Sequence, residues 1–127
     1  MKITGIGVDI TKNSRIKNML KNRQFINRVF SKDEINSSRK KFDKTSFFAK
    51  RFAAKEAFSK SLGTGISCNL NFKDIVVKND KSGKPFFKIN KKVKAIIYKK
   101  HKTKKFNFFL SITDEKNYSI AFVIFQK

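Results

Sequence analysis

The stretch from residue 47 to residue 66 constrains the fold more than any other part of the chain. It reads Phe-Phe-Ala-Lys-Arg-Phe-Ala-Ala-Lys-Glu-Ala-Phe-Ser-Lys-Ser-Leu-Gly-Thr-Gly-Ile, in which strong helix formers dominate. Thr45 or Ser46 can cap its start, and Gly63 and Gly65 can end it. At about 100° per residue, its apolar side chains spread around most of the circumference. The sequence therefore predicts a helix that is largely buried.

Glu56 stands out within this helix, because a carboxylate in an apolar setting needs a compensating partner. Lys60 follows one helical turn later, so an ion pair on one exposed edge of a core helix is the simplest explanation. The alternative is that Glu56 binds a cation or takes part in chemistry. Asp9 favours this alternative, since it is a second carboxylate flanked by apolar residues, Val8 and Ile10.

The composition limits the range of functions. A single domain spanning residues 1–127 fits the length. The formal net charge of +22 comes from 26 Lys and five Arg against nine acidic residues, and the chain has no Trp. Proteins that bind nucleic acids rely on Arg for bidentate and stacking contacts, so this surface favours a strongly acidic protein partner. A basic nucleic-acid-binding protein remains an alternative.

Cysteine usage and hydropathy indicate a cytoplasmic protein. Cys68 is the single cysteine, which excludes an internal disulfide and fits a reducing compartment, and we interpret it as structural or incidental. The longest apolar run, at residues 120–125, is too short to span a bilayer, and the N-terminus lacks the apolar region of a signal peptide.

Residues 2–10 predict a strand that ends at Asp9. Ile and Val dominate it, while Gly5 and Gly7 allow another backbone or a ligand to come close. Asp9 could also cap a following helix, although Thr11 or Asn13 would be the more natural caps.

Residues 11–32 contain no acidic residue, and their basic and apolar side chains alternate at roughly helical spacing. We expect an apolar inner face and a cationic outer face that can dock an acidic partner. Met19 and Phe25 are candidates for exposed apolar anchors on that face.

The remaining segments complete an α+β pattern. Ser31 and Glu34 have the spacing of a capping box and predict a short helix. Further expected elements are strands at 74–78 and 85–89 around a turn, a helix at 90–100, and a hairpin of strands at 106–112 and 118–125. Imperfect alternation in that hairpin suggests strands covered on both faces. The predicted fold is a mainly antiparallel sheet packed around one long buried helix.

Four motifs resemble those of one family. They are Gly-Ile-Gly-Val-Asp-Ile at residues 5–10, the block that begins Arg-Phe-Ala-Ala-Lys-Glu at residues 51–66, Gly-Lys-Pro at residues 83–85 and Ser-Ile-Thr at residues 111–113. In this order and spacing they resemble the holo-acyl-carrier-protein synthases, the small bacterial 4′-phosphopantetheinyl transferases, over essentially the whole chain. The resemblance implies that family's fold. It also implies an enzyme of fatty acid biosynthesis that transfers 4′-phosphopantetheine from coenzyme A to a serine of apo acyl carrier protein and releases adenosine 3′,5′-bisphosphate.

The resemblance implies a Mg²⁺ site formed by Asp9 and Glu56. Such a site would account for both carboxylates, because a hard cation can keep water and a substrate phosphate as its other ligands. Lys60 is the candidate to neutralise a pyrophosphate oxygen, so Glu56 and Lys60 are the expected catalytic residues. The group that takes the serine proton stays open between a metal-bound water and Glu56.

Further positions are expected to bind coenzyme A. Arg51 and Lys55 are candidates for its phosphates, although their helical phases differ from that of Glu56. The full expected set is Arg51, Lys55, Lys60, Gly63, Gly65, Gly83, Lys84, Pro85, Ser111 and Thr113.

Asp114 is the clearest departure from the family, which usually has His at this position. An ionised Asp cannot donate a hydrogen bond to a phosphate, and it could instead recruit a neighbouring Lys or a second ion. His101, the only histidine, is expected at the surface. Because of Asp114, a non-catalytic module that binds coenzyme A or carrier protein is a further alternative.

The resemblance also implies partners. The family docks the acidic acyl carrier protein on the helix after the first strand, which makes Arg15, Met19 and Arg23 the expected contacts. Family members are commonly homotrimers with active sites between subunits. Neither a nucleic acid nor a membrane is an expected partner.

Overall fold

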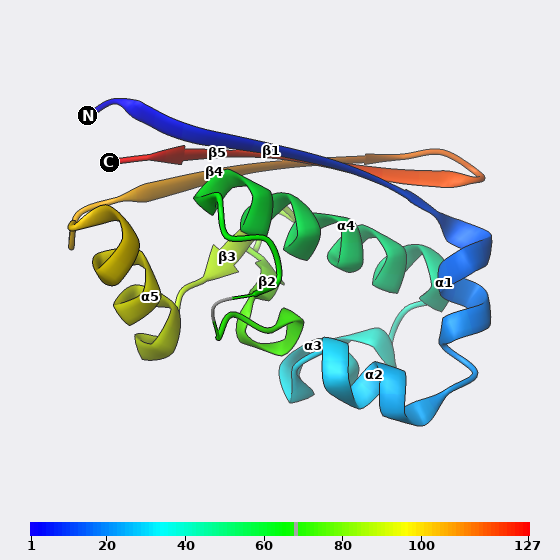
Figure 1. Cartoon of the computed structure of the whole chain (residues 1–127). Coiled ribbons are helices and arrows are strands. Elements are labelled where there is room, and N and C mark those ends of the chain that lie inside the picture. The colour runs from blue at the N-terminus through cyan, green and yellow to red at the C-terminus, as the bar shows by residue number, and fades with distance from the viewer. Residues whose placement is uncertain (68) are drawn as a thin grey trace.

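A computed structural model describes residues 1–67 and 69–127, so the interpretation of Cys68 concerns a residue outside the described part (Figure 1). In chain order the elements are β1 (Ile3–Lys12), α1 (Asn13–Met19), α2 (Arg23–Val29), α3 (Lys32–Ser38), α4 (Lys44–Leu62), a 3₁₀ turn (Phe72–Asp74), β2 (Val76–Asn79), β3 (Pro85–Lys88), α5 (Lys91–His101), β4 (Asn107–Asp114) and β5 (Tyr118–Gln126). Among the described residues, α4 included, no helix is long and apolar enough to cross a membrane.

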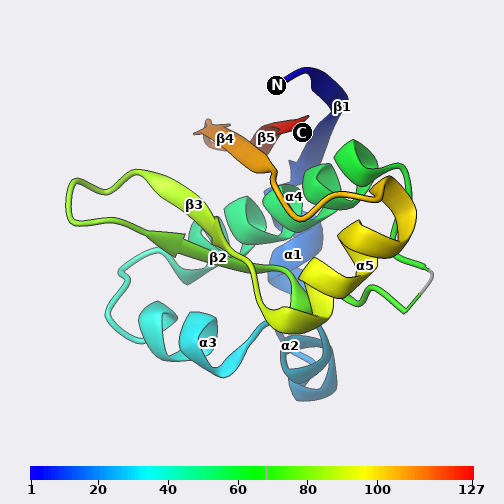
Figure 2. The ribbon, with the colours of Figure 1, turned by 90° about the vertical axis from the view of Figure 1, so that its left-hand side faces the viewer.

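The helix α4 packs against two antiparallel sheets. Strands β1, β5 and β4, in that order, form a sheet along one side of α4, and the β2–β3 hairpin lies beside α4 with β3 next to β4 (Figure 1 and Figure 2). Helices α1, α2 and α3 cover one end of α4, and α5 lies near the other end (Figure 1). The predicted α+β fold around one long helix is thus confirmed, with its strands divided between two sheets.

The boundaries of α4 follow from its flanking residues. Asp43, rather than the predicted Thr45 or Ser46, caps the start, because its Oδ1 accepts a hydrogen bond from the Ser46 backbone N–H at 3.0 Å. Gly63 ends the helix in the left-handed conformation with φ of 77°, as the sequence indicates. Most α4 side chains are buried, which confirms the helix predicted to be covered on nearly all sides.

The two glycines of β1 let this strand pack directly against the backbone of α4. A Cβ atom at Gly5 would lie 1.9 Å from the Ser61 carbonyl oxygen, and one at Gly7 would lie 1.9 Å from the Ala57 carbonyl oxygen. The prediction of a close backbone approach is confirmed, and the approaching backbone is α4 itself. The strand also runs past Asp9 to Lys12, so the predicted end at Asp9 is wrong.

The sheet is covered by α4 on its inner face only. Successive residues alternate between buried inner and more exposed outer positions, and the outer face carries large apolar side chains. Those exposed most are Ile3, Ile6, Val8, Ile10, Phe109 and Phe122. Within one chain, the expectation that the final hairpin is covered on both faces is therefore wrong.

The cationic N-terminal segment forms α1 and α2. Its apolar side chains pack against the phenylalanines in the first half of α4, with Ile16 and Phe30 fully buried. Phe25 is only 8% exposed and Met19 is half-buried, so Phe25 cannot be the exposed anchor that the sequence suggested. The residue at the N-cap of α1 is Lys12, and its side chain makes no capping hydrogen bond. Neither Thr11 nor Asn13, which the sequence favoured as caps, takes this position.

Candidate active site

Asp9 and Glu56 face the same small region between β1 and α4. Asp9 lies on the inner face of β1, opposite Ala121 of β5, and its Oδ2 accepts a hydrogen bond from the Thr11 hydroxyl at 2.8 Å. Lys60 lies over the strand, where its Nζ donates to the Val8 carbonyl at 3.0 Å and is 3.6 Å from Asp9 Oδ1. The ion pair of Lys60 therefore joins it to Asp9, rather than to Glu56 as the simplest interpretation of the helix suggested.

Electrostatics links Glu56 to the same group of residues. The pKa of Glu56 is raised, first by its burial and then by repulsion from the Asp9 carboxylate, while Lys60 and Arg15 oppose the rise. These four charged side chains come from β1, α1 and α4, and the structure thus gathers residues that are far apart in the sequence. A perturbed carboxylate beside a second carboxylate and two cations is typical of a functional site.

The pair of carboxylates fits a divalent cation of the Mg²⁺ type. Such a cation is commonly held by one or two protein carboxylates, with water and substrate phosphates as its other ligands. Repulsion between Asp9 and Glu56, together with the partial exposure of both, leaves them suited to share a cation. Within the described residues, no group of three or more His, Cys, Asp or Glu side chains could hold a metal.

Lys55 does not lie at this site. Its side chain is fully buried, and its Nζ donates to Glu34 Oε1 at 2.7 Å, to the Phe72 carbonyl at 2.9 Å and to the Ile75 carbonyl at 2.5 Å. All three protons of the ammonium group are used in these bonds. The prediction that Lys55 meets a coenzyme A phosphate is therefore wrong for this structure, because no donor and no surface remain.

Arg51 lies on another side of α4 from Glu56. The two are five residues apart, which corresponds to about 140° around the helix. Arg51 Nη2 donates to Asn79 Oδ1 at 2.6 Å, and its guanidinium stacks 3.9 Å from the centre of the Phe47 ring. Burial lowers the pKa of Arg51, and the Glu34 charge partly offsets this effect.

The predicted Gly83-Lys84-Pro85 turn is linked to Arg51 through Asn79. Asn79 Nδ2 donates to the Gly83 carbonyl at 2.9 Å, so Arg51, Asn79 and the turn form one connected group. The turn itself is closed by Asp80, whose Oδ1 accepts from the backbone N–H groups of Ser82 and Lys84.

The other predicted coenzyme A residues lie elsewhere. Gly63 and Gly65 follow the C-terminal end of α4, where Lys100 Nζ donates to the Gly63 carbonyl at 3.0 Å. Ser111 and Thr113 occupy exposed positions of β4 on the outer face of the sheet. The predicted set is thus divided in one chain among the Asp9 region, the Arg51 group, the C-terminal end of α4 and the outer face of the sheet, with Lys55 in the core.

The predicted partner residues lie on α1 and α2. Arg15 is close enough to Glu56 to affect its pKa, and its guanidinium lies 5.6 Å from the centre of the Phe52 ring. Met19 packs against the core from a half-buried position, and Arg23 is exposed at the start of α2. Arg15 therefore connects the expected docking surface with the carboxylate pair.

Asp114 and His101 both make contacts that the sequence did not indicate. Asp114 Oδ2 accepts a hydrogen bond from the Ser46 hydroxyl at 3.1 Å, which ties the end of β4 to the first turn of α4. No ion pair joins Asp114 to a lysine in the part of the chain described. The half-buried His101 ring lies edge-on to Phe125 and contacts the Leu62 carbonyl, so this residue keeps part of its surface exposed while it also packs against the core.

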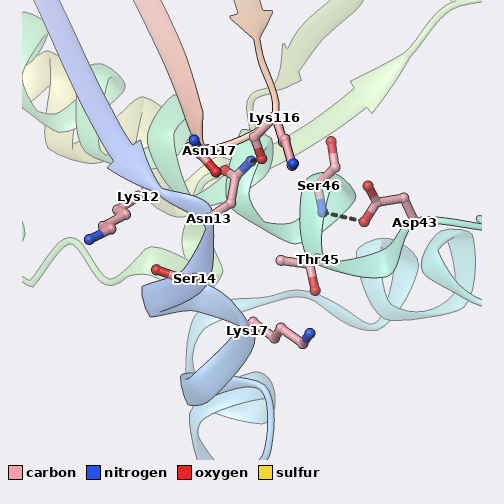
Figure 3. A pocket seen from close by; sticks show the side chains of 9 residues that line it. All are labelled: Lys12, Asn13, Ser14, Lys17, Asp43, Thr45, Ser46, Lys116 and Asn117. Carbon is pink, nitrogen blue, oxygen red and sulfur yellow. Dashed lines mark hydrogen bonds between the residues drawn. The ribbon is translucent and has the colours of Figure 1, made fainter.

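A cavity of about 350 Å³ lies where the start of α1, the first turn of α4 and the β4–β5 turn meet (Figure 3). Lys12, Lys17 and Lys116 give it a cationic lining. Asn13 closes its floor by donating to the Glu115 and Lys116 carbonyls and accepting from the Ser119 hydroxyl. Sequence reasoning missed this cavity, because its walls come from three separate segments and no single motif marks them.

Comparisons with known proteins show which family the chain belongs to. A family model for the 4′-phosphopantetheinyl transferase superfamily matches residues 5–123. The chain belongs to this superfamily. It is 61% identical to a holo-[acyl-carrier-protein] synthase of Pelagibacter ubique, over 100% of this chain and 99% of the relative.

Solved structures of the superfamily show the same fold. A holo-[acyl-carrier-protein] synthase from Neisseria meningitidis has a TM-score of 0.90 at 33% identity, covering 99% of this chain and 100% of that chain. A holo-(acyl-carrier-protein) synthase from Bacillus anthracis, in complex with CoA (3′,5′-ADP), has a TM-score of 0.82 at 35% identity, covering 98% and 97%.

Proposed function

We propose that the protein transfers 4′-phosphopantetheine from coenzyme A to a serine hydroxyl of apo acyl carrier protein. The observation that carries this proposal is the coupled pair of Asp9 and Glu56 beside Lys60, in a chain that matches holo-[acyl-carrier-protein] synthases over its full length. Structures of such relatives bound to CoA support coenzyme A as the donor.

In the proposed reaction the serine oxygen attacks the β-phosphorus of coenzyme A. The bond from this phosphorus to the oxygen that bridges it to the α-phosphorus breaks, and adenosine 3′,5′-bisphosphate leaves with the electron pair. Lys60 carries a half-exposed positive charge at the edge of the site and is placed to neutralise a pyrophosphate oxygen. Glu56 is the group we assign to accept the serine proton, because its partly buried carboxylate lies near Asp9, Lys60 and Arg15, where the serine would meet the pyrophosphate.

Asp9 and Glu56 are the residues that would hold Mg²⁺. When bound, the ion supplies positive charge beside the pyrophosphate, which favours the leaving group. The hydrogen bond from Thr11 fixes the orientation of the Asp9 carboxylate, so Thr11 belongs to the proposed site as a positioning residue.

The direct test is intact-protein mass spectrometry of apo acyl carrier protein after incubation with this protein, coenzyme A and Mg²⁺. We expect a mass gain of one phosphopantetheine that disappears in EDTA. A gain that persists in EDTA would remove the Mg²⁺ assignment. Binding of coenzyme A and carrier without any mass gain would instead identify a non-catalytic module.

Replacing Glu56 with Gln or Asp9 with Asn is expected to lower turnover by at least about 100-fold, because each change removes a carboxylate that would hold the cation beside the pyrophosphate. Both side chains are partly exposed, so the fold should survive, as circular dichroism can verify. Glu115→Gln is the matched control, since it removes an exposed carboxylate in the turn between β4 and β5. Equal activity in all three variants would contradict the assignment of Asp9 and Glu56.

We also propose that the protein is a homotrimer whose sites lie between subunits. Two features of one chain support this. The outer face of the sheet exposes 62% of Ile6, 55% of Val8 and 62% of Ile10, and neighbouring exposed apolar side chains of this kind often mark an interface. The expected coenzyme A residues are also divided between distant surfaces, and a neighbouring subunit could bring the Arg51 group of one chain to the Glu56 of another.

A charge on this face should dissociate the assembly. We expect Val8→Lys to shift the mass measured by multi-angle light scattering from trimer to monomer, because a buried unpaired ammonium is costly. Tyr98→Lys is the matched control, since it replaces a similarly exposed residue on α5. A monomeric wild-type protein, or a trimer that tolerates Val8→Lys, would contradict the proposed interface.

The cationic surface of α1 and α2 is the proposed docking site for the carrier. Arg15 and Arg23 supply charge to an acidic helix, and Met19 supplies an apolar edge. Because Arg15 also approaches Glu56, docking here would bring the acceptor serine to the carboxylate pair. We propose that the reaction takes place in the cytoplasm and serves fatty acid biosynthesis.

A further inference from the structure

Phe42 is the most exposed large apolar side chain among the described residues. Its relative exposure is 105%, so it contacts almost nothing in its own chain. It stands in the loop between α3 and α4, with Lys40 and Lys41 before it and Lys44 after Asp43. An aromatic ring in a cationic loop favours a planar, negatively charged ligand.

The ring lines a cavity of about 250 Å³ together with cationic side chains. Lys41, Lys50 and Arg51 contribute positive charge to it, and Asp43 contributes the one carboxylate, which is engaged in capping α4. A second cavity of about 310 Å³ shares Lys41, Phe47, Arg51 and Asn79 with the first. Its own carboxylate, Asp33, forms an ion pair with Lys78. The two cavities thus form one cationic groove.

Arg51 is the feature of this groove that favours binding of an anion. Its side chain is 6% exposed, and its one hydrogen bond to another described side chain goes to the neutral amide of Asn79. In the described part of the chain no carboxylate forms an ion pair with it, and its buried Nε has no partner. The Glu34 charge offsets only part of the cost of burying this guanidinium, and an anion bound beside Arg51 would offset more of it.

We propose that Phe42 determines nucleotide recognition, with its ring stacked on the adenine of coenzyme A and the adenosine phosphates directed toward Arg51 and Lys50. This inference rests on the proposed transferase function. A purine stacks on an aromatic face regardless of hydrogen bonding, and the neighbouring cations suit its phosphates. A cavity of about 250 Å³ fits a base, whereas a carrier-protein helix needs a far broader surface.

The absence of Trp from the sequence allows a direct binding experiment. In Phe42→Trp the new residue is the sole indole, so its fluorescence reports only on this position. We expect adenosine 3′,5′-bisphosphate to quench it in a saturable manner, while 4′-phosphopantetheine, which has no base, leaves it unchanged. Quenching by apo carrier protein alone would overturn the proposal and identify a protein-docking residue.

Truncation of the ring gives the second measurement. By calorimetry, Phe42→Ala should bind adenosine 3′,5′-bisphosphate about 5- to 100-fold more weakly than the wild type. Its KM for coenzyme A should rise while kcat stays within about twofold, because the lost contact is remote from the reacting phosphorus. Phe42→Tyr keeps an aromatic face and should behave like the wild type. Tyr98→Ala removes a half-exposed ring on α5 and serves as the control.

The failure of this inference is separable from failure of the proposed function. If the wild type transfers phosphopantetheine but Phe42→Ala binds the bisphosphate equally well, the stacking role is wrong and the reaction stands. If the wild type neither binds coenzyme A nor modifies the carrier, the function itself is wrong. An indole emission that depends on protein concentration without any ligand would place Phe42 in a contact between subunits, which also overturns the proposal.

Discussion

Replacing Lys55 with Met is expected to destabilise the fold by about 3–5 kcal/mol, which is a large part of the stability of a small domain. The ammonium group is buried against Glu34, which is 1% exposed, and against two backbone carbonyls. Methionine fills a similar volume but leaves the Glu34 charge and both carbonyls without their donor. Chemical denaturation followed by circular dichroism measures the loss.

Lys60→Met on the same helix is the control for this experiment. Its side chain is 52% exposed and its Nζ lies 3.6 Å from Asp9 Oδ1, so the ion pair is expected to contribute at most about 1 kcal/mol. The double variant Glu34→Gln with Lys55→Met should recover part of the loss, since no unpaired charge then remains. Equal stability of Lys55→Met and Lys60→Met would show that the buried pair does not hold the fold together.

The buried pair also explains how the β2–β3 hairpin is positioned. Glu34 caps α3 by accepting from the Ser31 N–H, and its other oxygen accepts from the Val77 N–H of β2. Lys55 binds the chain just before that strand through the Ile75 carbonyl. One ion pair thus fixes α3, α4 and β2 relative to one another, and with them Asn79 and the turn at residues 83–85.

The sequence predicted half of this arrangement. The capping box of Ser31 and Glu34 is present as expected, because capping depends on local spacing. The pairing of Glu34 with Lys55 was missed, since the two residues are 21 positions apart and a helix covered on nearly all sides does not reveal which polar residue points inward. The resemblance assigned Lys55 to the ligand, whereas its burial assigns it to the core.

In the candidate site, too, the sequence revealed features that depend on neighbouring residues and missed those that depend on the folded chain. Asp9 and Glu56 could be singled out because each is a carboxylate in an apolar setting, and the structure places them near enough for their charges to interact. Their metal-binding role stays a prediction. Phe42 gave no signal in the sequence, because its exposure depends on how the loop between α3 and α4 leaves the core.

The outer face of the large sheet was misjudged for a related reason. Outward residues such as Ile120 and Phe122 are as apolar as the inward Ala121 and Val123, so the expected polar alternation is absent. Apolar side chains on both faces of a strand predict that other parts of the structure pack against both faces. One chain supplies only α4, and in the proposed trimer a neighbouring subunit would supply the second cover.

Gly7→Ala is expected to prevent β1 from packing on α4. The new Cβ would lie 1.9 Å from the Ala57 carbonyl oxygen and 2.9 Å from the Ser61 backbone nitrogen, and both atoms belong to the backbone of a buried helix. No side-chain rotation can relieve such a contact, so the strand has to move away from the helix. Overpacking in a rigid setting costs about 1–3 kcal/mol or more, and here we expect the upper end or failure to fold.

Gly65→Ala is the matched control for Gly7→Ala, because the same methyl group meets nothing within 4 Å there and only the positive φ of 60° opposes it, at about 1–2 kcal/mol. Thermal unfolding of both variants separates steric overlap from backbone strain. Because Asp9 follows Gly7 by two residues on the same face of β1, any displacement of the strand should also separate Asp9 from Glu56. A Gly7→Ala protein that folds with β1 displaced from α4 should therefore lose transferase activity along with stability. A stable and active variant would instead show that the contact between β1 and α4 is not what brings Asp9 and Glu56 together.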